Sequence, residues 1–373
     1  MKRPSLAPII AELPATVPFV GPEVIERRTG IPFRARLGAN ESVFGPSPKV
    51  IAAIQSAAGD VWSYGDSEIF DVRTALAAHL GTAIDTISVG EGIDALLGLT
   101  CRLFLTPGDR VVTSLGAYPT FNYHVAAQGA ELVKVPYEND RESLAGLIEA
   151  CRAAPTRIVY LANPDNPMGT WWPAHEIAAF IDAIPPETLI VLDEAYGETA
   201  PAGTLPDIAL ARPNLLRFRT FSKAYGLAGM RIGYALGPSE TIAAFDRIRN
   251  HFGVNKLAQI AAVAAIEDQA YLARTVAAIA AGRDEIARRA RSLGLDPIAS
   301  ATNFVAIDCG NAARAQTLLD ALIERRIFVR KPMVQGLDRC IRLSVGTPAD
   351  IALACDALAE AVDESKFERW SNS

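Results

Sequence analysis

Lys223 stands in a short turn of small residues, within TFSKAYGLAGMR, and Arg231 ends the same segment. A lysine side chain normally extends into water, so a lysine placed among small residues between two apolar segments needs a specific reason. The amine of such a lysine can attack a carbonyl group or act as a general base. The residue type and its setting therefore predict covalent or proton-transfer chemistry at Lys223.

Other polar side chains follow two of the apolar segments that come before Lys223. Asn166 comes shortly after TRIVYLAN, and Asp193 ends TLIVLD, with Tyr196 just beyond it. Taken singly, these residues have ordinary explanations, because NPDNPMG is a common turn and an aspartate can cap the next helix. Taken together, all four residues fall beyond the ends of consecutive strand candidates, where one small ring could contact them all.

A glycine turn, GEGIDA at residues 90–95, follows another strand candidate and begins a helical pattern. It fits the permissive GxGxx(G/A) pattern of nicotinamide dinucleotide sites. That fingerprint also needs an acidic residue at the end of the next strand, where this chain has Thr113-Ser114-Leu115. Two interpretations remain open: a turn at a helix N-terminus can bind a phosphate through backbone N–H groups, or it can simply connect two elements.

These residues must be positioned by a sheet, because apolar segments alternate with helical patterns from Trp62 onward. Helical spacing is clear in residues 94–104 and 174–184. The alternation predicts an α/β fold with a mainly parallel sheet and helices on both faces. The strand candidates of this sheet are residues 86–90, 109–114, 130–136, 156–163, 188–194, 215–221 and 231–237.

The pattern changes after about Lys256, where a long alanine- and arginine-rich helical run begins. Further strand candidates follow it, separated by helices, and these elements predict a smaller α+β domain at the C-terminus. The strand candidates of that domain are residues 302–308, 326–332 and 340–346. We expect a proline-rich N-terminal arm over residues 1–35, a large domain over residues 36–260 and a small domain over residues 261–373.

Composition excludes several classes of function. The 373 residues are 50% hydrophobic and carry a formal net charge of −6, whereas nucleic acids and anionic membranes are bound by basic surfaces. No segment is long and apolar enough for a membrane span, and the five widely spaced cysteines suit buried thiols in a reducing cytoplasm. The four histidines are scattered, which gives no support to a metal site.

A lysine that forms a Schiff base, an aspartate for a pyridinium nitrogen, donors for a phenolate and a phosphate site are together what pyridoxal 5'-phosphate requires. At this point the chain resembles the fold-type I pyridoxal-phosphate aminotransferases (class I/II), and among them the histidinol-phosphate aminotransferases. The resemblance runs from about Asn40 to Thr347, and its most specific part is SKAYGLAGMRIGY. It implies a transaminase that exchanges an amino group between a substrate amine and a 2-oxo acid.

The resemblance implies a role for each residue around the cofactor ring. Lys223 matches the lysine that forms the imine with the cofactor, and Asp193 matches the partner of the ring nitrogen. Asn166 and Tyr196 match the pair that hydrogen-bonds the ring hydroxyl. Tyr118, in GAYPTF, matches the aromatic residue that stacks on the ring.

The resemblance also assigns the phosphate ligands. Ser222 and Arg231 match the side chains that hold the phosphate, together with the backbone around Gly92, Ile93 and Asp94 in the glycine turn. Under this assignment the turn binds a phosphate and does more than connect two elements.

Residues more distant in the sequence match substrate and subunit contacts. Tyr64, in WSYGD, matches a tyrosine that reaches the phosphate of the neighbouring subunit, which implies a homodimer with shared active sites. Arg342, in CIRLSVGTP, and Arg330, in IFVRKP, match the pair that holds the anionic end of the substrate.

The segment NESVFG departs from the family, where histidinol-phosphate aminotransferases often have NENPYG. Phe44 then replaces a tyrosine whose hydroxyl can bond the substrate phosphate, and a phenylalanine also suits an apolar or aromatic side chain. We therefore expect histidinol phosphate as the substrate, with an aromatic amino acid as the alternative. A threonine-phosphate decarboxylase and a non-enzymatic sensing domain are weaker alternatives.

Overall fold

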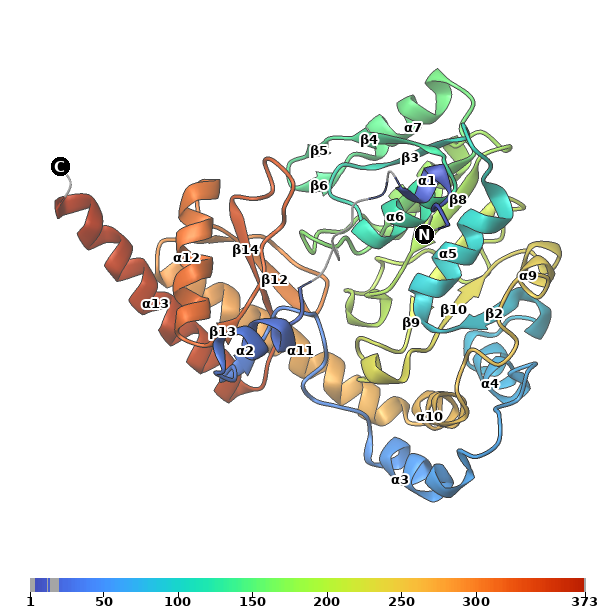
Figure 1. Cartoon of the computed structure of the whole chain (residues 1–373), viewed down its shortest axis with the longest axis horizontal. Helices are drawn as coiled ribbons and strands as arrows, with labels where there is room; N and C mark the ends of the chain where they lie inside the picture. The colour runs from blue at the N-terminus through green and yellow to red at the C-terminus, as the bar shows by residue number, and fades with distance from the viewer. Residues whose placement is uncertain (1–3, 12, 14–19, 372–373) are drawn as a thin grey trace.

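The computed structural model of the chain describes residues 4–11, 13 and 20–371 (Figure 1). A large sheet with its helices forms one part of the molecule, and the C-terminal elements form a smaller part beside it. Asp193 and Lys223, the two residues predicted to carry the central chemistry, lie where strands of the large sheet end.

The central sheet has seven strands in the order β2-β10-β9-β8-β7-β3-β4. β10 is antiparallel to both of its neighbours, and the other pairs in the sheet are parallel, which confirms the predicted mainly parallel sheet. The strands are β2 (Ile87–Gly90), β3 (Arg110–Ser114), β4 (Glu131–Val135), β7 (Ile158–Ala162), β8 (Leu189–Asp193), β9 (Leu215–Thr220) and β10 (Gly233–Leu236).

Side chains of the middle strands alternate between two helical layers. In β7, Ile158 and Tyr160 pack with the helices α5 and α6, whereas Val159 and Leu161 pack with α7 and α8. Both faces are buried, which is why these segments read as continuous apolar runs in the sequence. The four helices are α5 (Gly92–Phe104), α6 (Pro119–Ala127), α7 (Leu144–Ala153) and α8 (Ala174–Ala183).

A further group of helices packs at the β2 edge of the sheet, and the helical run predicted after Lys256 begins among them. The run is divided into α10 and α11 at Asp268, whose φ of −108° and ψ of 57° leave the helical region. Residues of α10 pack into the core beside β2 and β10, whereas residues of α11 pack into the C-terminal core. The elements are α3 (Pro48–Ala57), α4 (Phe70–Leu80), α9 (Ser239–Phe245), α10 (Lys256–Ile266) and α11 (Gln269–Ser292).

The C-terminal part has its own three-stranded antiparallel sheet, in the order β11-β12-β14, and its own core. Ala35 and Leu37 also belong to that core. We keep the predicted division at residues 35 and 260 as a proposal. The elements are β11 (Asp296–Pro297), β12 (Phe304–Asp308), α12 (Ala312–Glu324), β13 (Ile327–Phe328), β14 (Cys340–Ser344) and α13 (Pro348–Ser371).

The N-terminal segment crosses both parts of the molecule. α1 (Pro8–Ala11) lies beside α6, and α2 (Pro22–Thr29) lies beside the C-terminal elements (Figure 1). β1 (Ala35–Arg36) then pairs in parallel with β13. This pairing, which the sequence analysis did not predict, directs the next residues into the space between the two parts.

Short elements complete the chain. The strands β5 and β6 form a hairpin that was not predicted, with positive φ at Asn139 and Asp140 in its turn. These elements are η1 (Ala58–Asp60), η2 (Ile84–Thr86), β5 (Tyr137–Glu138), β6 (Arg141–Glu142), η3 (Gly197–Thr199) and η4 (Ala228–Met230). No helix within the described ranges is long and apolar enough to cross a membrane.

Candidate active site

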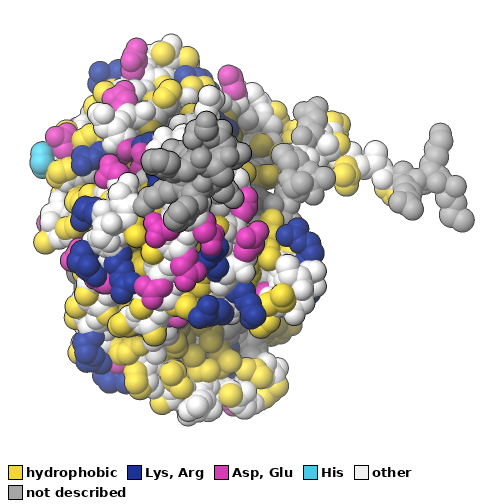
Figure 2. Space-filling view, turned by 90° about the vertical axis from the view of Figure 1, so that its left-hand side faces the viewer, with side chains coloured by type: hydrophobic (Ala, Val, Ile, Leu, Met, Phe, Trp, Pro, Cys, Tyr) yellow, Lys and Arg dark blue, Asp and Glu magenta, His cyan; other side chains and the backbone are white. Residues whose placement is uncertain are grey.

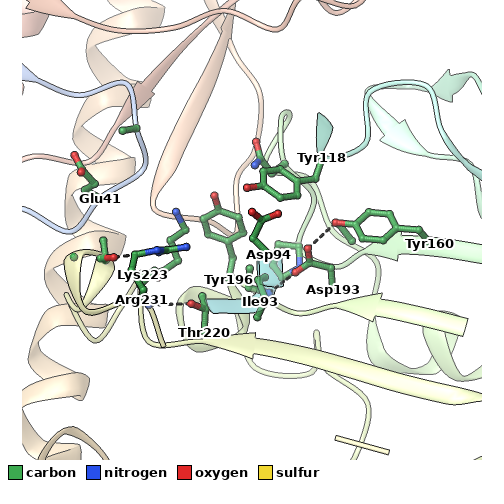
Figure 3. Close-up of a pocket in the computed structure, with 18 residues that line it drawn as sticks. Glu41, Ile93, Asp94, Tyr118, Tyr160, Asp193, Tyr196, Thr220, Lys223 and Arg231 are labelled. Atoms are coloured by element: carbon green, nitrogen blue, oxygen red, sulfur yellow. Dashed lines mark hydrogen bonds between the residues drawn. The ribbon is translucent and has the colours of Figure 1, made fainter. Parts of the chain in front are cut away.

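A pocket of about 320 Å³ lies at the carboxyl ends of β7, β8 and β9, beside the N-terminus of α5 (Figure 3). This is the edge at which open α/β sheets bind ligands. Nine of the predicted site residues line this one pocket: Ile93, Asp94, Tyr118, Asn166, Asp193, Tyr196, Ser222, Lys223 and Arg231.

Lys223 lies in the turn that follows β9, and small residues allow that turn to pack closely. Gly226 has a φ of +70°, and a Cβ there would be 2.4 Å from the main-chain oxygen of Gly45. The Lys223 Nζ donates a hydrogen bond to the main-chain oxygen of Asn40 at 3.1 Å. The small residues around Lys223 therefore let its turn pack directly against the segment that follows β1.

The electrostatic setting of Lys223 favours the neutral amine. Burial and the nearby positive charge of Arg342 lower the pKa of Lys223 to about 8 from its usual value of 10.5. Its Nζ also lies 5.5 Å from the centre of the Tyr196 ring. Above a pH of about 8 most of the amine is unprotonated, which is the form that acts as a nucleophile or a base.

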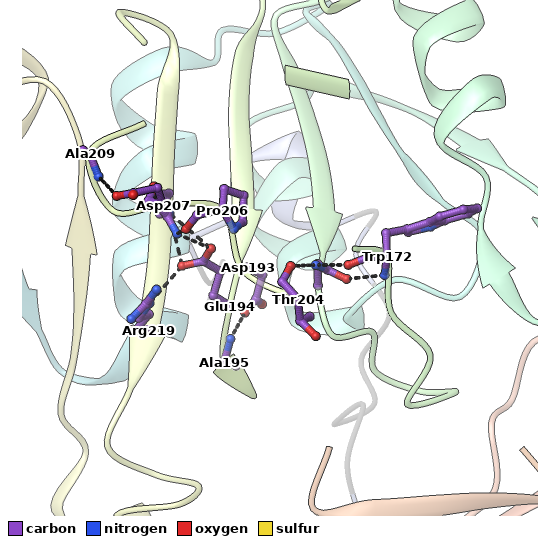
Figure 4. Close-up of polar contacts among 11 residues, drawn as sticks. Trp172, Asp193, Glu194, Ala195, Thr204, Pro206, Asp207, Ala209 and Arg219 are labelled. Atoms are coloured by element: carbon purple, nitrogen blue, oxygen red, sulfur yellow. Dashed lines mark hydrogen bonds and ion pairs between the residues drawn. The ribbon is translucent and has the colours of Figure 1, made fainter. Parts of the chain in front are cut away.

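Asp193 lies at the end of β8 and is buried at the base of the pocket. Its Oδ2 accepts a hydrogen bond from the Tyr160 hydroxyl at 2.6 Å, and its Oδ1 accepts one from the Ala195 N–H at 2.9 Å (Figures 3 and 4). Burial raises the pKa of Asp193, while these two donors and Lys223 act in the opposite direction. A cation placed against this carboxylate would strengthen that opposing effect.

The neighbouring carboxylate, Glu194, is neutralised by other partners. Its oxygens pair with Arg217 at 2.8 Å and Arg219 at 2.9 Å (Figure 4). Burial opposes ionisation of Glu194, but the two guanidinium groups outweigh it and lower the pKa of this residue. Asp193 is thus the carboxylate of this pair that is left to interact with a group in the pocket.

Asn166 and Tyr196 are held by residues of the C-terminal part and of the N-terminal segment. The Arg342 Nη1 donates to Asn166 Oδ1 at 2.6 Å, and the Asn40 Nδ2 donates to the Tyr196 hydroxyl at 2.8 Å. Asn40 Oδ1 in turn accepts a hydrogen bond from the Ser344 hydroxyl at 3.0 Å. The amide of Asn166 and the phenol of Tyr196 are therefore oriented by contacts between the two parts of the molecule.

The glycine turn and Arg231 lie together at the start of α5. Gly92 has a φ of +80°, and a Cβ there would lie 2.8 Å from Arg231 Nη2. Only glycine therefore lets the guanidinium approach the first turn of the helix. Backbone N–H groups at this end and a guanidinium together suit a phosphate. Ser222 and Asp94 line the same pocket.

Tyr118 precedes the first residue of α6, also at the pocket. Burial raises the pKa of its phenol, and the carboxylates of Asp94 and Asp193 add to the effect, so this ring stays neutral. A neutral, partly buried aromatic ring beside the pocket suits stacking on a flat ligand.

The two predicted substrate arginines lie at a neighbouring cavity. Arg342 and Arg330 both line a space between the large sheet and the C-terminal part that also touches Asn166. Their main chains form a bridge, and Arg330 Nη2 donates to the main-chain oxygen of Val20 at 2.9 Å. This arrangement places two guanidinium groups next to the pocket that Lys223 and Asp193 share.

Two predicted residues lie away from the pocket of their own chain. Phe44 packs against the C-terminal core and is not among the residues that line the pocket. Tyr64 is 78% exposed, and its ring lies 4.8 Å from that of Phe252. The roles that the sequence analysis gave to Phe44 and Tyr64 stay predictions.

Two residues that contact the site directly, Asn40 and Tyr160, were not predicted from the sequence. Asn40 bonds both Lys223 and Tyr196, although these three residues lie far apart in the sequence. Tyr160 lies inside a buried strand, where its hydroxyl needs a partner. That single polar atom in an apolar run was the available sequence signal for Tyr160. For Asn40 the sequence held no signal apart from the family resemblance.

Comparison with known proteins agrees with this geometry. Residues 35–358 match the family model described as aminotransferase class I and II. The chain belongs to the class I and II aminotransferases. Residues 1–34 and 359–373 lie outside the match.

The similar aminotransferases carry a more specific name. Histidinol-phosphate aminotransferase 1 of Thiobacillus denitrificans is 38% identical over 88% of this chain and 85% of its own length. The enzyme of Anaeromyxobacter sp. named histidinol-phosphate aminotransferase is 37% identical over 92% of this chain and 95% of its own length. A crystal structure of histidinol-phosphate aminotransferase from Sinorhizobium meliloti, in complex with pyridoxal-5'-phosphate, is 53% identical with a TM-score of 0.93 and covers 96% of this chain and 98% of that one.

Proposed function

We propose that this aminotransferase uses pyridoxal 5'-phosphate to exchange an amino group between histidinol phosphate and 2-oxoglutarate. The observation that carries the proposal is the pairing of Lys223 and Asp193 in one pocket. The amine of Lys223 has its pKa lowered to about 8, and the carboxylate of Asp193 is held by two hydrogen-bond donors. The names of the similar enzymes support the choice of substrate.

The residues of the pocket fit the cofactor group by group. Arg231 and the first turn of α5 would hold its phosphate, Asp193 would pair with the ring nitrogen, and Lys223 would bond to its aldehyde carbon. When bound, pyridoxal phosphate supplies a protonated ring that accepts the electron pair left after a proton is removed from the substrate α-carbon. The freed Lys223 amine is placed to take that proton and return it.

The two arginines beside the pocket support an anionic substrate. Arg342 is partly buried, and this burial lowers its pKa to about 10, so it remains a cation at neutral pH. A second cation, Arg330, lies next to it, and two guanidinium groups can bind a phosphate or a carboxylate. An aromatic amino acid is the second candidate, because Phe44 provides no hydroxyl for a substrate phosphate.

We expect kcat/KM for histidinol phosphate with 2-oxoglutarate to exceed that for phenylalanine or tyrosine by about tenfold or more, since a phosphate adds hydrogen bonds to charged groups. The measurement is amino-acid formation in steady state, with release of carbon dioxide from threonine phosphate assayed in parallel. Phe44→Tyr should raise the preference for the phosphate substrate. If kcat/KM for phenylalanine or tyrosine is equal to or higher than that for histidinol phosphate, an aromatic amino acid becomes the proposed substrate.

We also propose a homodimer in which each Tyr64 completes the partner's site. Large hydrophobic side chains are exposed around α3 and the start of α4, and the Tyr64 ring lies against that of Phe252 among them. Figure 2 shows hydrophobic side chains gathered at the lower end of one face, at the level of α3 in Figure 1. Contiguous apolar surface of this kind marks an interface. The exposed side chains are Ile51, Val61, Trp62, Tyr64, Phe70 and Phe252.

Hybrid dimers test the shared site. Lys223→Ala and Tyr64→Phe are each expected to be strongly impaired, but a hybrid of the two has one site with both native residues. Refolding an equal mixture should restore about a quarter of the wild-type activity, since half of the dimers are hybrids with one good site. The matched control refolds each variant alone. No gain in the mixture, or a fully active monomer in sedimentation, would contradict the shared site.

The five cysteines of the chain are buried free thiols. Unpaired cysteines suit a reducing compartment, so we propose a cytoplasmic location for the enzyme.

A further inference from the structure

Tyr160 is a buried tyrosine that has no part in the assignments above except as a donor to Asp193. It lies on β7 with no exposed surface, and its hydroxyl is 2.6 Å from Asp193 Oδ2. In Figure 3 its ring points from the edge of the pocket toward the Asp193 carboxylate. A hydrogen bond to a charged acceptor at this distance is among the stronger ones in proteins.

Packing fixes the Tyr160 ring. The ring stacks on Phe121 with 4.5 Å between centroids and an interplanar angle of 21°. Tyr160 is paired with Val191 on the neighbouring strand, and Ala162 is paired with Asp193, so the tyrosine and the aspartate lie on the same face of the sheet. The hydroxyl is thus held against the carboxylate by the strand register and by the core.

The surroundings of Asp193 make this donor important. The carboxyl groups of Glu142 and Asp165 are also buried nearby, and each interacts unfavourably with a charge on Asp193. The other titratable groups that face Asp193 are Tyr118, Glu194, Tyr196 and Lys223. Burial and the charge of Glu194 raise the pKa of Asp193, whereas the hydrogen bonds from Tyr160 and Ala195 lower it and favour the ionised carboxylate.

We propose that Tyr160 is a positioning residue for transamination: its hydroxyl keeps the Asp193 carboxylate oriented and ionised, so that it can pair with the ring nitrogen of the cofactor. This inference rests on the proposed use of pyridoxal phosphate. Tyr160 acts through Asp193 and itself transfers no proton to the substrate.

Removing the hydroxyl should weaken the charged pair between Asp193 and the ring nitrogen. A hydrogen bond to an ionised group corresponds to about a tenfold to hundredfold change in an equilibrium. With less positive charge on the ring, the nitrogen that would link Lys223 to the cofactor has a higher pKa. The pH midpoint of the absorbance change of the bound cofactor should then rise, and kcat should fall more than KM changes.

The test compares Tyr160→Phe with Tyr137→Phe. Tyr137 is a partly buried tyrosine, and it donates to Asp165 at 2.8 Å, so both variants lose one bond from a phenol to a buried carboxyl. Circular dichroism and thermal unfolding report the structural cost, which both variants should share. We expect Tyr160→Phe alone to lower kcat by about tenfold to a hundredfold and to raise the absorbance midpoint by about one pH unit or more.

Phe121→Leu provides a second variant that keeps the hydroxyl but loosens the ring, and we expect a smaller rise of the same midpoint. It also keeps the test available if Tyr160→Phe does not fold. If folded Tyr160→Phe keeps the wild-type midpoint, the proposed role of Tyr160 is wrong, although the proposed transamination is unaffected. If only Phe121→Leu folds, a wild-type midpoint in that variant leads to the same conclusion. An equal rise in Tyr137→Phe would also overturn the role of Tyr160, because the effect would then not depend on Asp193. Wild-type protein that neither binds pyridoxal phosphate nor transaminates would overturn the proposed function and this inference with it.

Discussion

Lys223→Ala is expected to abolish turnover and to remove the absorption band of the bound cofactor. Loss of a general base alone typically costs about 10²- to 10⁴-fold in rate, and this variant also loses the amine that would bond to the cofactor aldehyde. The measurements are an absorbance spectrum of the purified variant with added pyridoxal phosphate and single-turnover kinetics with the substrate amine.

The pH dependence of covalent loading gives the same prediction a second readout. The pKa of Lys223 is lowered to about 8, so the folded protein disfavours its charged form. Below that pH the amine is mostly protonated and cannot attack, and above it the amine is mostly neutral. We expect the rate at which cofactor-free protein takes up pyridoxal phosphate covalently to rise with pH and to reach half its maximum at about pH 8.

Lys49→Ala is the matched control, because that side chain is 67% exposed and its ion pair to Asp268 spans 3.7 Å. Exposed pairs of this kind contribute about 0–1 kcal/mol, so the control should keep both the band and the activity. A Lys223→Ala enzyme with wild-type turnover would remove the cofactor assignment altogether.

The alternating pattern of the sequence was sufficient to predict the strands of the large sheet. Segments such as residues 158–162 and 189–193 are buried on both faces, and their apolar runs end where polar side chains begin. Lys223, Asp193 and Asn166 follow the ends of such runs, so a parallel sheet must bring them to one edge. For this reason their meeting in one pocket could be predicted without any long-range contact.

Contacts across the two parts of the molecule could not be predicted in this way. Asn40 reaches Lys223 and Tyr196 because β1 pairs with β13, and that pairing involves strands of only two residues each. Elements this short leave no periodic pattern in the sequence. The division of the long helical run at Asp268 was missed for a related reason, since the alanine-rich sequence on both sides favours helix and only tertiary packing distinguishes the two helices.

Asp193→Asn is expected to retain the cofactor yet lose about 10²- to 10³-fold in kcat, the usual cost of removing one electrostatic stabiliser from an active site. Lys223, Arg231 and the first turn of α5 would still hold the cofactor. The amide keeps the size of the side chain and an oxygen for the Ala195 N–H, but it carries no charge to keep the ring nitrogen protonated. The band of the bound cofactor should therefore persist while the catalytic rate falls.

Asp165→Asn is the matched control for this charge. Asp165 is also a buried carboxyl near the pocket, and burial raises its pKa to about 7, so near pH 7 only about half of it is charged. Its oxygens accept from the Tyr137 hydroxyl at 2.8 Å and from the Met168 N–H at 3.0 Å, as those of Asp193 accept from Tyr160 and Ala195. The same substitution thus removes a carboxyl with similar partners but less negative charge. If both variants lost kcat equally, the loss would reflect disturbed packing beneath the pocket, and Asp193 would have no special role at the ring nitrogen.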